Sequence, residues 1–451
     1  MTIVHIWGLA WNGGGRPQTG FIVSAQQLAA RHIVDSVMST DAVRGPTRSS
    51  SPGARQIWAD AQRPRLCVPE TPSEGDVDLG LRLAVIVMTK RPSNFITWLT
   101  YHREVIGAMH FFIRIEDTPA LAEYLSTPPW NSLCTVTAAE SCVRDWKEQS
   151  QRQFNHAAAS ITAAKGLGVT HVLHIDDDEL LYLPSGIQPL RAAISHASST
   201  NGCVELHALN LEALAPMIQC TNPFAECCAF RHMPDDFDSY GRAELCHGKS
   251  IGIVNGPVPL HPYSPHHFKG PGPVPERLAA PDAILPRSLM LPPPTAVILH
   301  YESCSYRRWR DKFSDYAWRF RHHGRRAIAL AASFSPFYRQ SIAACARLLG
   351  FEAEADALGL RVLPPKWPTA ATGGHDAEDA ARAVWSRSKL EPPEVSASRP
   401  VAHMRTLGRL TLIPPPAAAV ASGETTAAAE RALEAAMGRA AAGKTGFAST
   451  A

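Results

Sequence analysis

The residues best suited to catalysis or ligand binding lie in one short segment, residues 174–184. Its sequence is His-Ile-Asp-Asp-Asp-Glu-Leu-Leu-Tyr-Leu-Pro. Four acidic side chains in a row, Asp176 to Glu179, stand between two apolar stretches. Carboxylates this close together repel one another strongly unless a cation offsets their charge. The segment therefore predicts a site that binds or pairs with a cation, and not a solvated acidic surface.

The spacing of Asp176 and Asp178 favours a divalent metal ion. On an extended chain one carboxylate can meet a metal while the other meets a ligand hydroxyl. Mg²⁺ and Mn²⁺ bind a few carboxylates and complete their shell with phosphate oxygens. This predicts a metal–diphosphate site, where the metal neutralises charge on a departing nucleotide diphosphate. Since Asp-x-Asp is a weak motif alone, an acidic loop capping the next helix and an adventitious calcium site are the alternatives.

The elements that must position this segment follow an alternating pattern. Strands are predicted over residues 83–88, 110–115, 133–137 and 172–175, and helices over 94–106 and 146–165. Strand and helix alternating in this way predict an α/β fold with a mostly parallel sheet flanked by helices. Ligands bind at the carboxyl ends of the strands in such sheets, which is where Asp176 falls.

The chain of 451 residues is expected to hold one such domain with irregular tails. Residues 1–80 are rich in Gly, Pro, Ser and Arg and predict an irregular N-terminal segment or linker. Residues 81–350 form the expected α/β domain. Residues 351–451 are rich in Pro and Ala, which predicts a largely disordered C-terminal tail.

Composition excludes several classes of protein. A net charge of +3 is too small for a polyanion-binding surface, so no nucleic-acid partner is expected. No apolar run is long enough for a membrane-spanning helix, and the first residues do not resemble a signal peptide. The expected location is therefore cytoplasmic, with a Golgi or membrane location as the alternative if the start of the chain is mis-assigned.

Ten cysteines are spread along the chain without a Cys-x-x-Cys pair, which argues against a zinc ribbon or a thioredoxin-type redox site. Four of them crowd one region: Cys220, Cys227, Cys228 and Cys246. Free or buried thiols are expected there, with one disulfide as the alternative.

Several segments, taken in order, resemble a known enzyme family. They are 98–102 (Trp-Leu-Thr-Tyr-His), 107–112 (Gly-Ala-Met-His-Phe-Phe), 115–118 (Ile-Glu-Asp-Thr), the helix 146–155, 175–179, 247–251 (His-Gly-Lys-Ser-Ile) and 298–301 (Ile-Leu-His-Tyr) with Lys312-Phe313. Together they resemble nucleotide-sugar glycosyltransferases of the GT-A fold, most of all the family 2-like and family 92 (DUF23) group. The resemblance covers about residues 81–315.

The resemblance implies a metal-dependent transfer of a sugar from a UDP- or GDP-sugar to a hydroxyl of a glycan, protein or lipid acceptor. The cofactor would be Mn²⁺ or Mg²⁺. The implied roles are nucleotide contact for Asp117, ribose or metal contact for Asp176, metal ligation for Asp178, metal or diphosphate contact for His300, phosphate pairing for Lys249, and shaping of the sugar or acceptor pocket for Glu179.

An inverting, hexosyltransferase-like reaction is expected, and it needs a carboxylate to take the acceptor proton. The candidates are Glu179, Asp235, Asp236, Asp238 and Glu302, with Glu179 and Glu302 preferred. The alternative function is a non-catalytic carbohydrate-binding or scaffold protein on the same fold. A metal-dependent nucleotidyltransferase is disfavoured because the sequence lacks a basic triphosphate cradle.

Three further features leave two interpretations open. Lys249 is a phosphate contact or a surface lysine, and His300 is a ligand-facing histidine or a core histidine bonded to backbone. His261, His266 and His267 lie in a Pro- and Gly-rich loop and are weaker candidates for metal contact. The segment 307–326 is a basic, aromatic helix with a solvated face, or it makes a peripheral contact with an anionic membrane or an acidic acceptor.

Overall fold

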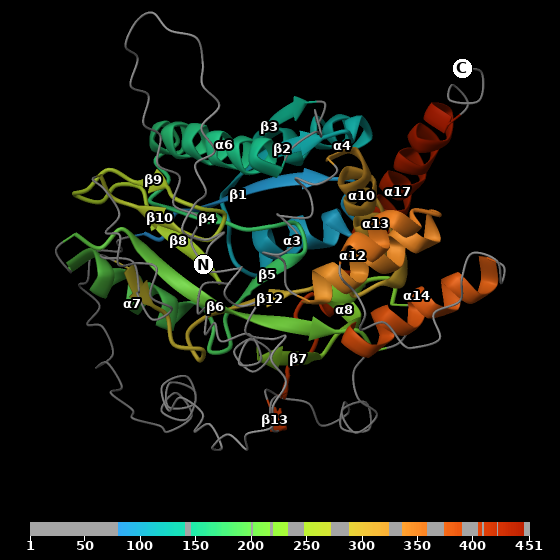
Figure 1. Ribbon diagram of the computed structural model, residues 1–451. Helices are drawn as coiled ribbons and strands as arrows, with labels where there is room; N and C mark the ends of the chain where they lie inside the picture. Colours follow the sequence, from blue (N-terminus) through green and yellow to red (C-terminus); the bar gives the residue numbers. More distant parts are fainter. Residues whose placement is uncertain are drawn as a thin grey trace, which may run out of the picture. The chain divides into compact units, whose positions relative to one another are not determined.

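A computed structural model describes residues 80–139, 146–199, 202–216, 220–232, 248–271, 288–323, 336–358, 374–389, 405–407, 410–421 and 423–445. It has an α/β fold, in which a large mixed sheet is flanked by helices (Figure 1). The expected α/β class is confirmed. The segment expected to be an N-terminal linker lies, apart from Gly80, outside the described residues.

Parallel strands form the half of the sheet that leads to the acidic segment. They run in the order β3-β2-β1-β4, with bounds β1 (Leu83–Lys90), β2 (His110–Glu116), β3 (Cys134–Ala139) and β4 (His171–His174). The run from Leu83 to Val87 is apolar and buried, as expected for a central strand covered on both faces. Because the four strands are parallel, their carboxyl ends meet at one edge of the sheet.

Helices make the crossovers between these strands. They are α3 (Phe95–Glu104), α4 (Pro119–Leu125), α5 (Trp130–Leu133) and α6 (Trp146–Gly166). Gly168 follows α6 with a φ of +66°, the left-handed conformation that commonly ends a helix. The strands and the two long helices expected before the acidic segment are all present, and their bounds agree within a few residues.

The remaining strands make the sheet mixed, which corrects the expectation of a mostly parallel sheet. They are β5 (Glu179–Tyr182), β6 (Glu205–Leu214), β7 (Ala229–His232), β8 (Lys249–Ile253), β11 (Ser288–Met290) and β12 (Val297–His300). β8 is antiparallel to both β4 and β6, and β12 is parallel to β6 but antiparallel to β5. Only residues 175–178 separate β4 from β5, and β5 pairs with β12 and not with β4.

Short elements complete this part of the chain. They are α7 (Ile187–Ser199), α8 (Pro223–Glu226) and the antiparallel hairpin of β9 (His261–Pro262) and β10 (Phe268–Lys269). The hairpin carries two of the histidines of the Pro- and Gly-rich loop near its ends, His261 and His267. Cys220, Cys227 and Cys228 are buried free thiols, as expected, whereas Cys246 lies outside the described residues.

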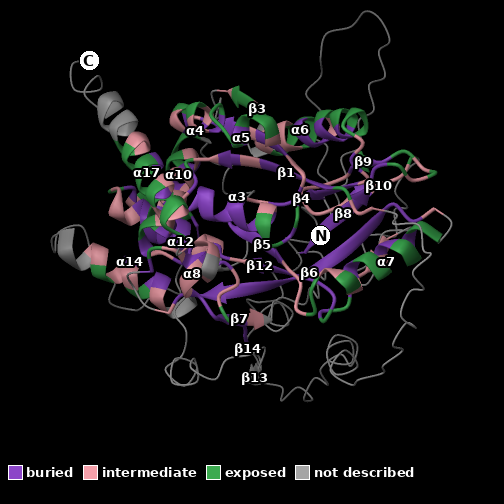
Figure 2. Cartoon of the chain, turned by 180° about the vertical axis from the view of Figure 1, so that it is seen from behind, coloured by how far each residue is buried: buried purple, intermediate pink, exposed green. Residues whose placement is uncertain are grey.

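Two helices cover opposite faces of the parallel strands β1, β2 and β4, which are buried along most of their length (Figure 2). α6 packs Ala157 and Ile161 into a core with Ala84, Ile86 and Phe112 of β1 and β2. On the other side, the indole Nε1 of Trp98 in α3 donates a hydrogen bond of 2.7 Å to the carbonyl oxygen of Glu179. α3 thereby ties β5, the strand that follows the acidic segment, to the core.

The described part of residues 351–451 is folded, which corrects the expectation of a largely disordered tail. The segment contains α13 (Glu352–Ala357) and α14 (Gly374–Lys389), which pack against the preceding helices α10 (Tyr306–His323) and α12 (Pro336–Leu348). They are followed by β13 (Arg405–Leu407), β14 (Leu410–Leu412), α16 (Ala418–Ala421) and α17 (Glu424–Thr445). β14 pairs with β7 and extends the sheet. Buried Trp385 donates a 2.8 Å hydrogen bond to the carbonyl of Ser303. Compositional bias therefore did not prevent these segments from burying apolar side chains.

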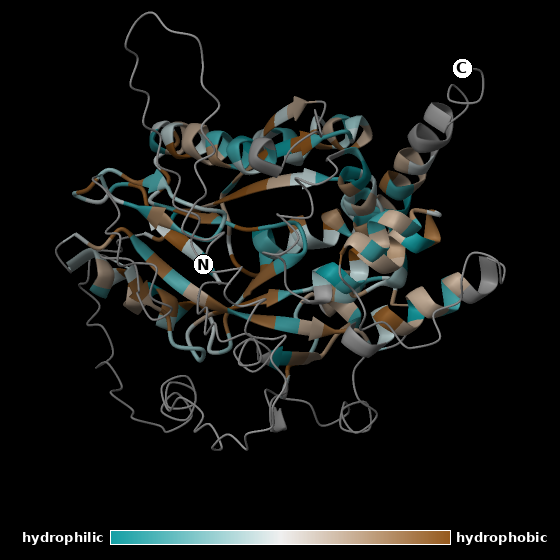
Figure 3. Ribbon diagram, viewed as in Figure 1, coloured by the Kyte–Doolittle hydropathy of each residue, from teal (hydrophilic) through white to brown (hydrophobic). Residues whose placement is uncertain are grey.

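Hydrophobic and hydrophilic residues lie in the same elements, as along β6 (Figure 3). None of the helices in the described ranges is long and apolar enough to cross a membrane. The long strand β6 is buried throughout, yet it carries Glu205, His207, Asn210 and Glu212. Since buried polar groups need partners, this strand marks a polar region inside the sheet.

We expect Glu430→Ala to lower the free energy of unfolding by about 1 kcal/mol, the usual cost of losing a helix cap. The Glu430 carboxylate in α17 accepts a 2.6 Å hydrogen bond from the amide of Thr97 in the first turn of α3, whose own N-cap, Asn94, provides no side-chain bond. Chemical denaturation of the full chain measures the loss. Arg431→Ala, an exposed change in the same helix, is the control, and equal losses would contradict this role.

Candidate functional site

The acidic segment forms a tight turn at the carboxyl edge of the parallel strands. The amide of Ile175 donates to the carbonyl of Ile86 in β1 at 3.1 Å, and the amide of Glu179 donates to the carbonyl of Asp176 at 3.2 Å. The carbonyl of Asp178 accepts a 2.7 Å bond from the amide of Tyr301, just after β12. Backbone bonds to two different strands therefore fix where the carboxylates lie.

A buried lysine neutralises the first of these carboxylates. Nζ of Lys249, at the start of β8, lies 2.6 Å from Oδ2 of Asp176 and 3.3 Å from Oε2 of Glu179. The same ammonium donates to the carbonyl of Pro265 at 3.2 Å, and the lysine side chain is 0% exposed. Lys249 is thus an internal counter-charge of the turn and not a surface lysine.

Burial and this ion pair set the protonation of the three groups. Burial alone would raise the pKa of Asp176, but the Lys249 ammonium holds it well below its usual range. Burial raises the pKa of Glu179 to about 7, although Lys249 opposes that shift. Burial would lower the pKa of Lys249, but Asp176 and Glu179 raise it above its ordinary value. Asp176 and Lys249 are therefore charged at neutral pH, while Glu179 titrates near it.

A second cation reaches the turn from the basic helix α10. Arg308 Nη2 lies 3.1 Å from Oδ1 of Asp177 and 3.6 Å from Oδ2 of Asp178. Asp177 Oδ2 also accepts a 2.5 Å hydrogen bond from the hydroxyl of Thr89 in β1. The helix expected to present a solvated basic face thus directs one arginine inward, where it joins α10 to the acidic turn.

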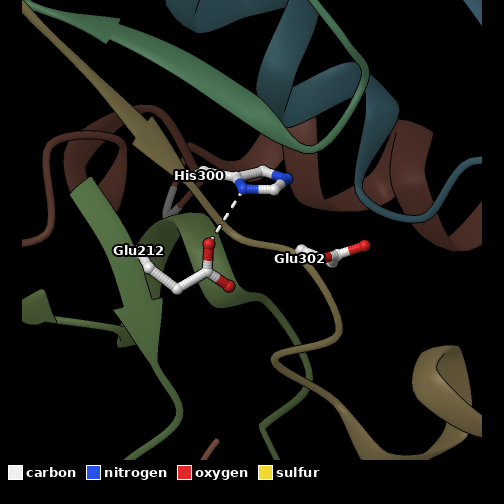
Figure 4. Close-up of side chains that lie close together, drawn as sticks. All are labelled: Glu212, His300 and Glu302. Carbon is white, nitrogen blue, oxygen red and sulfur yellow. Dashed lines mark ion pairs between the residues drawn. The ribbon is translucent and has the colours of Figure 1, made fainter. Parts of the chain in front are cut away.

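On the other side of Asp178 stands a cluster of two glutamates and a histidine, Glu212, His300 and Glu302 (Figure 4). Nδ1 of His300 lies 2.9 Å from Oε2 of Glu212, and Nε2 lies 3.8 Å from Oδ1 of Asp178. Burial alone would lower the pKa of His300, but Glu212 and Asp178 raise it to about 10. His300 therefore pairs with carboxylate side chains, and it is not a core histidine bonded to backbone.

Strand pairing explains why these side chains meet. Glu179 in β5 is opposite His300 in β12, and His300 is opposite Glu212 in β6. Partners in a sheet share a face, so the three residues form one row across three strands. Asn210 lies two residues before Glu212 and hence on the same face, and Lys249 of β8 is opposite Ala208 on that face. One polar stripe thus runs from Lys249 to His300.

Glu302, the second residue after β12, lies at the end of this stripe. One of its oxygens, Oε1, accepts hydrogen bonds from the ammonium of Lys312 in α10 and the hydroxyl of Tyr338 in α12. The two donors fix the orientation of the carboxylate. The helices of the C-terminal half therefore contribute directly to the site.

At the ends of β1 and β2, Asp117 lies beside Lys90, with Nζ 3.3 Å from Oδ2. Asp117 has a φ of +51°, an unusual conformation for a residue other than glycine and one that is often found at functional sites. Asp117 and Asp176 follow strands on either side of β1. The residue expected to contact a nucleotide thus shares an edge of the sheet with the acidic turn.

The structure brings most of the predicted site residues to this edge. Asp178, Glu179, His300 and Glu302 belong to one region, and Lys249 joins Asp176 to it. Asp176 and Asp178, however, face different partners, Lys249 in one case and Arg308 and His300 in the other. Asp235, Asp236 and Asp238 lie outside the described residues.

The loop histidines take other partners. His267 Nδ1 lies 3.0 Å from Oε1 of buried Glu205, and His266 Nδ1 lies 3.0 Å from the carbonyl oxygen of Gly248. His261, at the start of β9, is exposed. These contacts hold the loop against β6 and β8 near the buried ammonium of Lys249, a structural role.

The sequence analysis missed Glu212, Asn210, Arg308 and Lys312. Glu212 and Asn210 had a usable signal, because polar residues recur at every second position of an otherwise apolar strand, β6. The sequence signal for Arg308 and Lys312 was weak. Many basic residues lie in α10, and the sequence does not show which of its faces turns toward the sheet.

We expect Lys249→Met to destabilise the protein by about 3–5 kcal/mol near pH 8, because it leaves buried Glu179 and half-buried Asp176 without their cation. The folded-state pKa of both carboxylates then rises above the unfolded value. Their protonation restores stability as the pH falls, so the difference from wild type should shrink between pH 8 and pH 5.

Chemical denaturation at the two pH values measures this effect, and Lys165→Met, a change at an exposed position, is the control. A loss that is the same at pH 5 and pH 8 would show that the buried charges are not its cause.

Comparison with known proteins adds no assignment to this geometry. No protein-family model matches the chain, and no curated protein is significantly similar to it. What the chain does must therefore be inferred from the chemistry of the acidic turn and its neighbours.

Proposed function

We propose that this protein is a metal-dependent glycosyltransferase with a GT-A-like domain, which moves a sugar from a UDP- or GDP-sugar to a hydroxyl of a glycan, protein or lipid. One observation supports this most: consecutive aspartates follow a buried strand at the carboxyl ends of the parallel strands, with Lys249 and Arg308 beside them. That edge is where α/β sheets bind ligands, and nucleotides in particular.

Charge balance supports a requirement for a divalent cation. The described site holds six carboxylates, Asp176, Asp177, Asp178, Glu179, Glu212 and Glu302, against four cationic groups, Lys249, Arg308, Lys312 and protonated His300. If all six are ionised, negative charge remains in excess. A nucleoside diphosphate, itself an anion, does not bind such an edge unless a metal ion such as Mn²⁺ or Mg²⁺ accompanies it.

The reaction requires a base for the acceptor proton and positive charge near the departing diphosphate. The bond between the anomeric carbon and a phosphate oxygen breaks as the acceptor oxygen attacks that carbon, and a carboxylate takes the acceptor proton. Fixed positive charge stabilises the departing diphosphate, and Arg308 is the best-placed arginine because α10 and the turn both hold it.

Glu179 is the preferred base. Its pKa of about 7 suits a group that must accept a proton near neutral pH. Within the described residues, its hydrogen bond from the Asp176 amide and its ion pair with Lys249 both fall on Oε2. The other oxygen, Oε1, is the atom assigned to the acceptor proton.

The first test is donor hydrolysis and transfer by the full chain, with a panel of UDP- and GDP-sugars in the presence and absence of Mn²⁺. We expect activity that depends on the metal, and we expect Arg308→Met to lower kcat/KM at least about tenfold, the value of one charge-assisted hydrogen bond. Arg307→Met is the matched control, because that side chain is 89% exposed and that of Arg308 is 19% exposed. Equal effects of the two changes, or no hydrolysis of any donor, would contradict the proposal.

The second test is the pH profile. A base must be deprotonated to act, so kcat/KM should fall about tenfold per pH unit below about 7, where Glu179 becomes protonated. Glu179→Gln should remove most of the activity at all pH values. If the variant keeps the activity and the acid limb of wild type, another group is the base.

One observation favours the second candidate, a non-catalytic carbohydrate-binding or scaffold protein. Each of the three aspartates of the turn already lies near a cationic group of the chain itself. A fold could keep such pairs for stability alone. Calorimetry separates the two functions: binding of oligosaccharides without binding of UDP or GDP, with or without Mn²⁺, would favour the second.

A further inference from the structure

We propose that Glu212, His300 and Glu302 bind a divalent transition metal ion, and that the Asp176–Asp178 pair does not. The inference rests on the proposed function for the role of the metal and deepens it by naming the ligands. The occupant assigned to this cluster is an ion such as Mn²⁺.

The Asp176–Asp178 pair fits a shared metal poorly. The Asp176 carboxylate already has a cation, the fully buried ammonium of Lys249 at 2.6 Å. A divalent ion at that oxygen would lie next to a positive charge that has no route to solvent. Asp178 is directed elsewhere, toward Arg308 and His300.

The distances in the second cluster suit one ion. One ligand atom from each of Glu212, His300 and Glu302 lies within 4.8 Å of the others. Metal–ligand bonds of about 2.0–2.2 Å place two ligands of one ion at most about 4.3 Å apart. Ligand atoms near the outer limit of 4.8 Å must therefore move together when an ion binds. Asp178, with Oδ1 3.8 Å from His300 Nε2, is the next carboxylate along.

Asn210 supplies an independent observation. It lies on the same face of β6 as Glu212, is 7% exposed, and its Oδ1 has no hydrogen-bond partner among the described residues. A buried amide oxygen without a partner is costly. Amide oxygens bind metal ions and accept hydrogen bonds from metal-bound water. An ion beside Glu212 accounts for this orphaned atom.

The supporting contacts are those of a preorganised site. β12 lies between β5 and β6, so strand pairing on both sides holds the backbone of His300. Lys312 and Tyr338 both bond Oε1 of Glu302 and fix the orientation of that carboxylate. Outer contacts of this kind set the geometry of metal ligands.

The donor set selects among metals. An imidazole nitrogen with two carboxylates favours a transition ion such as Mn²⁺ over Mg²⁺ or Ca²⁺, which prefer oxygen ligands only.

Titration of the full chain with Mn²⁺ in the absence of nucleotide, followed by electron paramagnetic resonance of the free ion, tests the site directly. We expect Glu212→Gln, Glu302→Gln and His300→Gln each to weaken Mn²⁺ binding by about 10–100-fold. Asp176→Asn and Glu104→Gln, the latter at an exposed position, should leave it unchanged. No binding by wild type, or loss with Asp176→Asn but not with the two glutamate variants, would overturn the inference.

Thermal unfolding guards against variants that fold poorly. Mn²⁺ should raise Tm for wild type and Asp176→Asn but not for a folded Glu302→Gln, because a bound ligand stabilises only the state that binds it. A rise of equal size in Glu302→Gln would overturn the inference.

The two proposals fail separately. Mn²⁺ binding at this cluster without binding or hydrolysis of any nucleotide sugar would support the metal site and contradict glycosyl transfer. Metal-dependent sugar transfer, with an Mn²⁺ affinity that Glu212→Gln and Glu302→Gln leave unchanged, would support glycosyl transfer and contradict the metal site.

Discussion

The site depends on one buried charge, the ammonium of Lys249. It lies inside the sheet with Asp176 and Glu179 as partners, and it lets consecutive carboxylates end a buried strand. Without it, the turn would hold like charges in a region of low dielectric, and they would have to protonate or move apart. Lys249 is the first residue of β8. The antiparallel pairing of β8 with β4 therefore brings its ammonium beside the turn that follows β4.

Much of the fold could be predicted because burial leaves a direct trace in sequence. The apolar run Leu83–Val87, the helical spacing of α3 and α6 and the glycines after α6 reflect local physics. The acidic turn was equally visible in the sequence. Four adjacent carboxylates between apolar runs repel one another unless a cation lies beside them. The strand bounds and the place of Asp178 and Glu179 at the end of a strand followed from these patterns, whereas His300 was brought to the site by a resemblance of motifs.

The rest is set by long-range pairing, which no local pattern encodes. The mixed sheet arises because β5 leaves β4 after a short turn and pairs with β12, more than a hundred residues later. The pairing of β12 with β6 then places Glu212 beside His300. The folded C-terminal segments escaped prediction for a related reason: Ala- and Pro-rich helices such as α17 gain their stability from contacts with α3 and α4, and not from their own sequence.

The same topology gives the site two electrostatic halves with different roles. On one side, Lys249 and Arg308 offset the aspartates of the turn, so charge there is balanced within the chain. On the other, Glu212 and Glu302 lie around His300, and Lys312 donates to one oxygen of Glu302. β12 pairs with β5 beside the turn and also carries His300 of the cluster, so an ion bound at the proposed site would lie one strand away from Glu179.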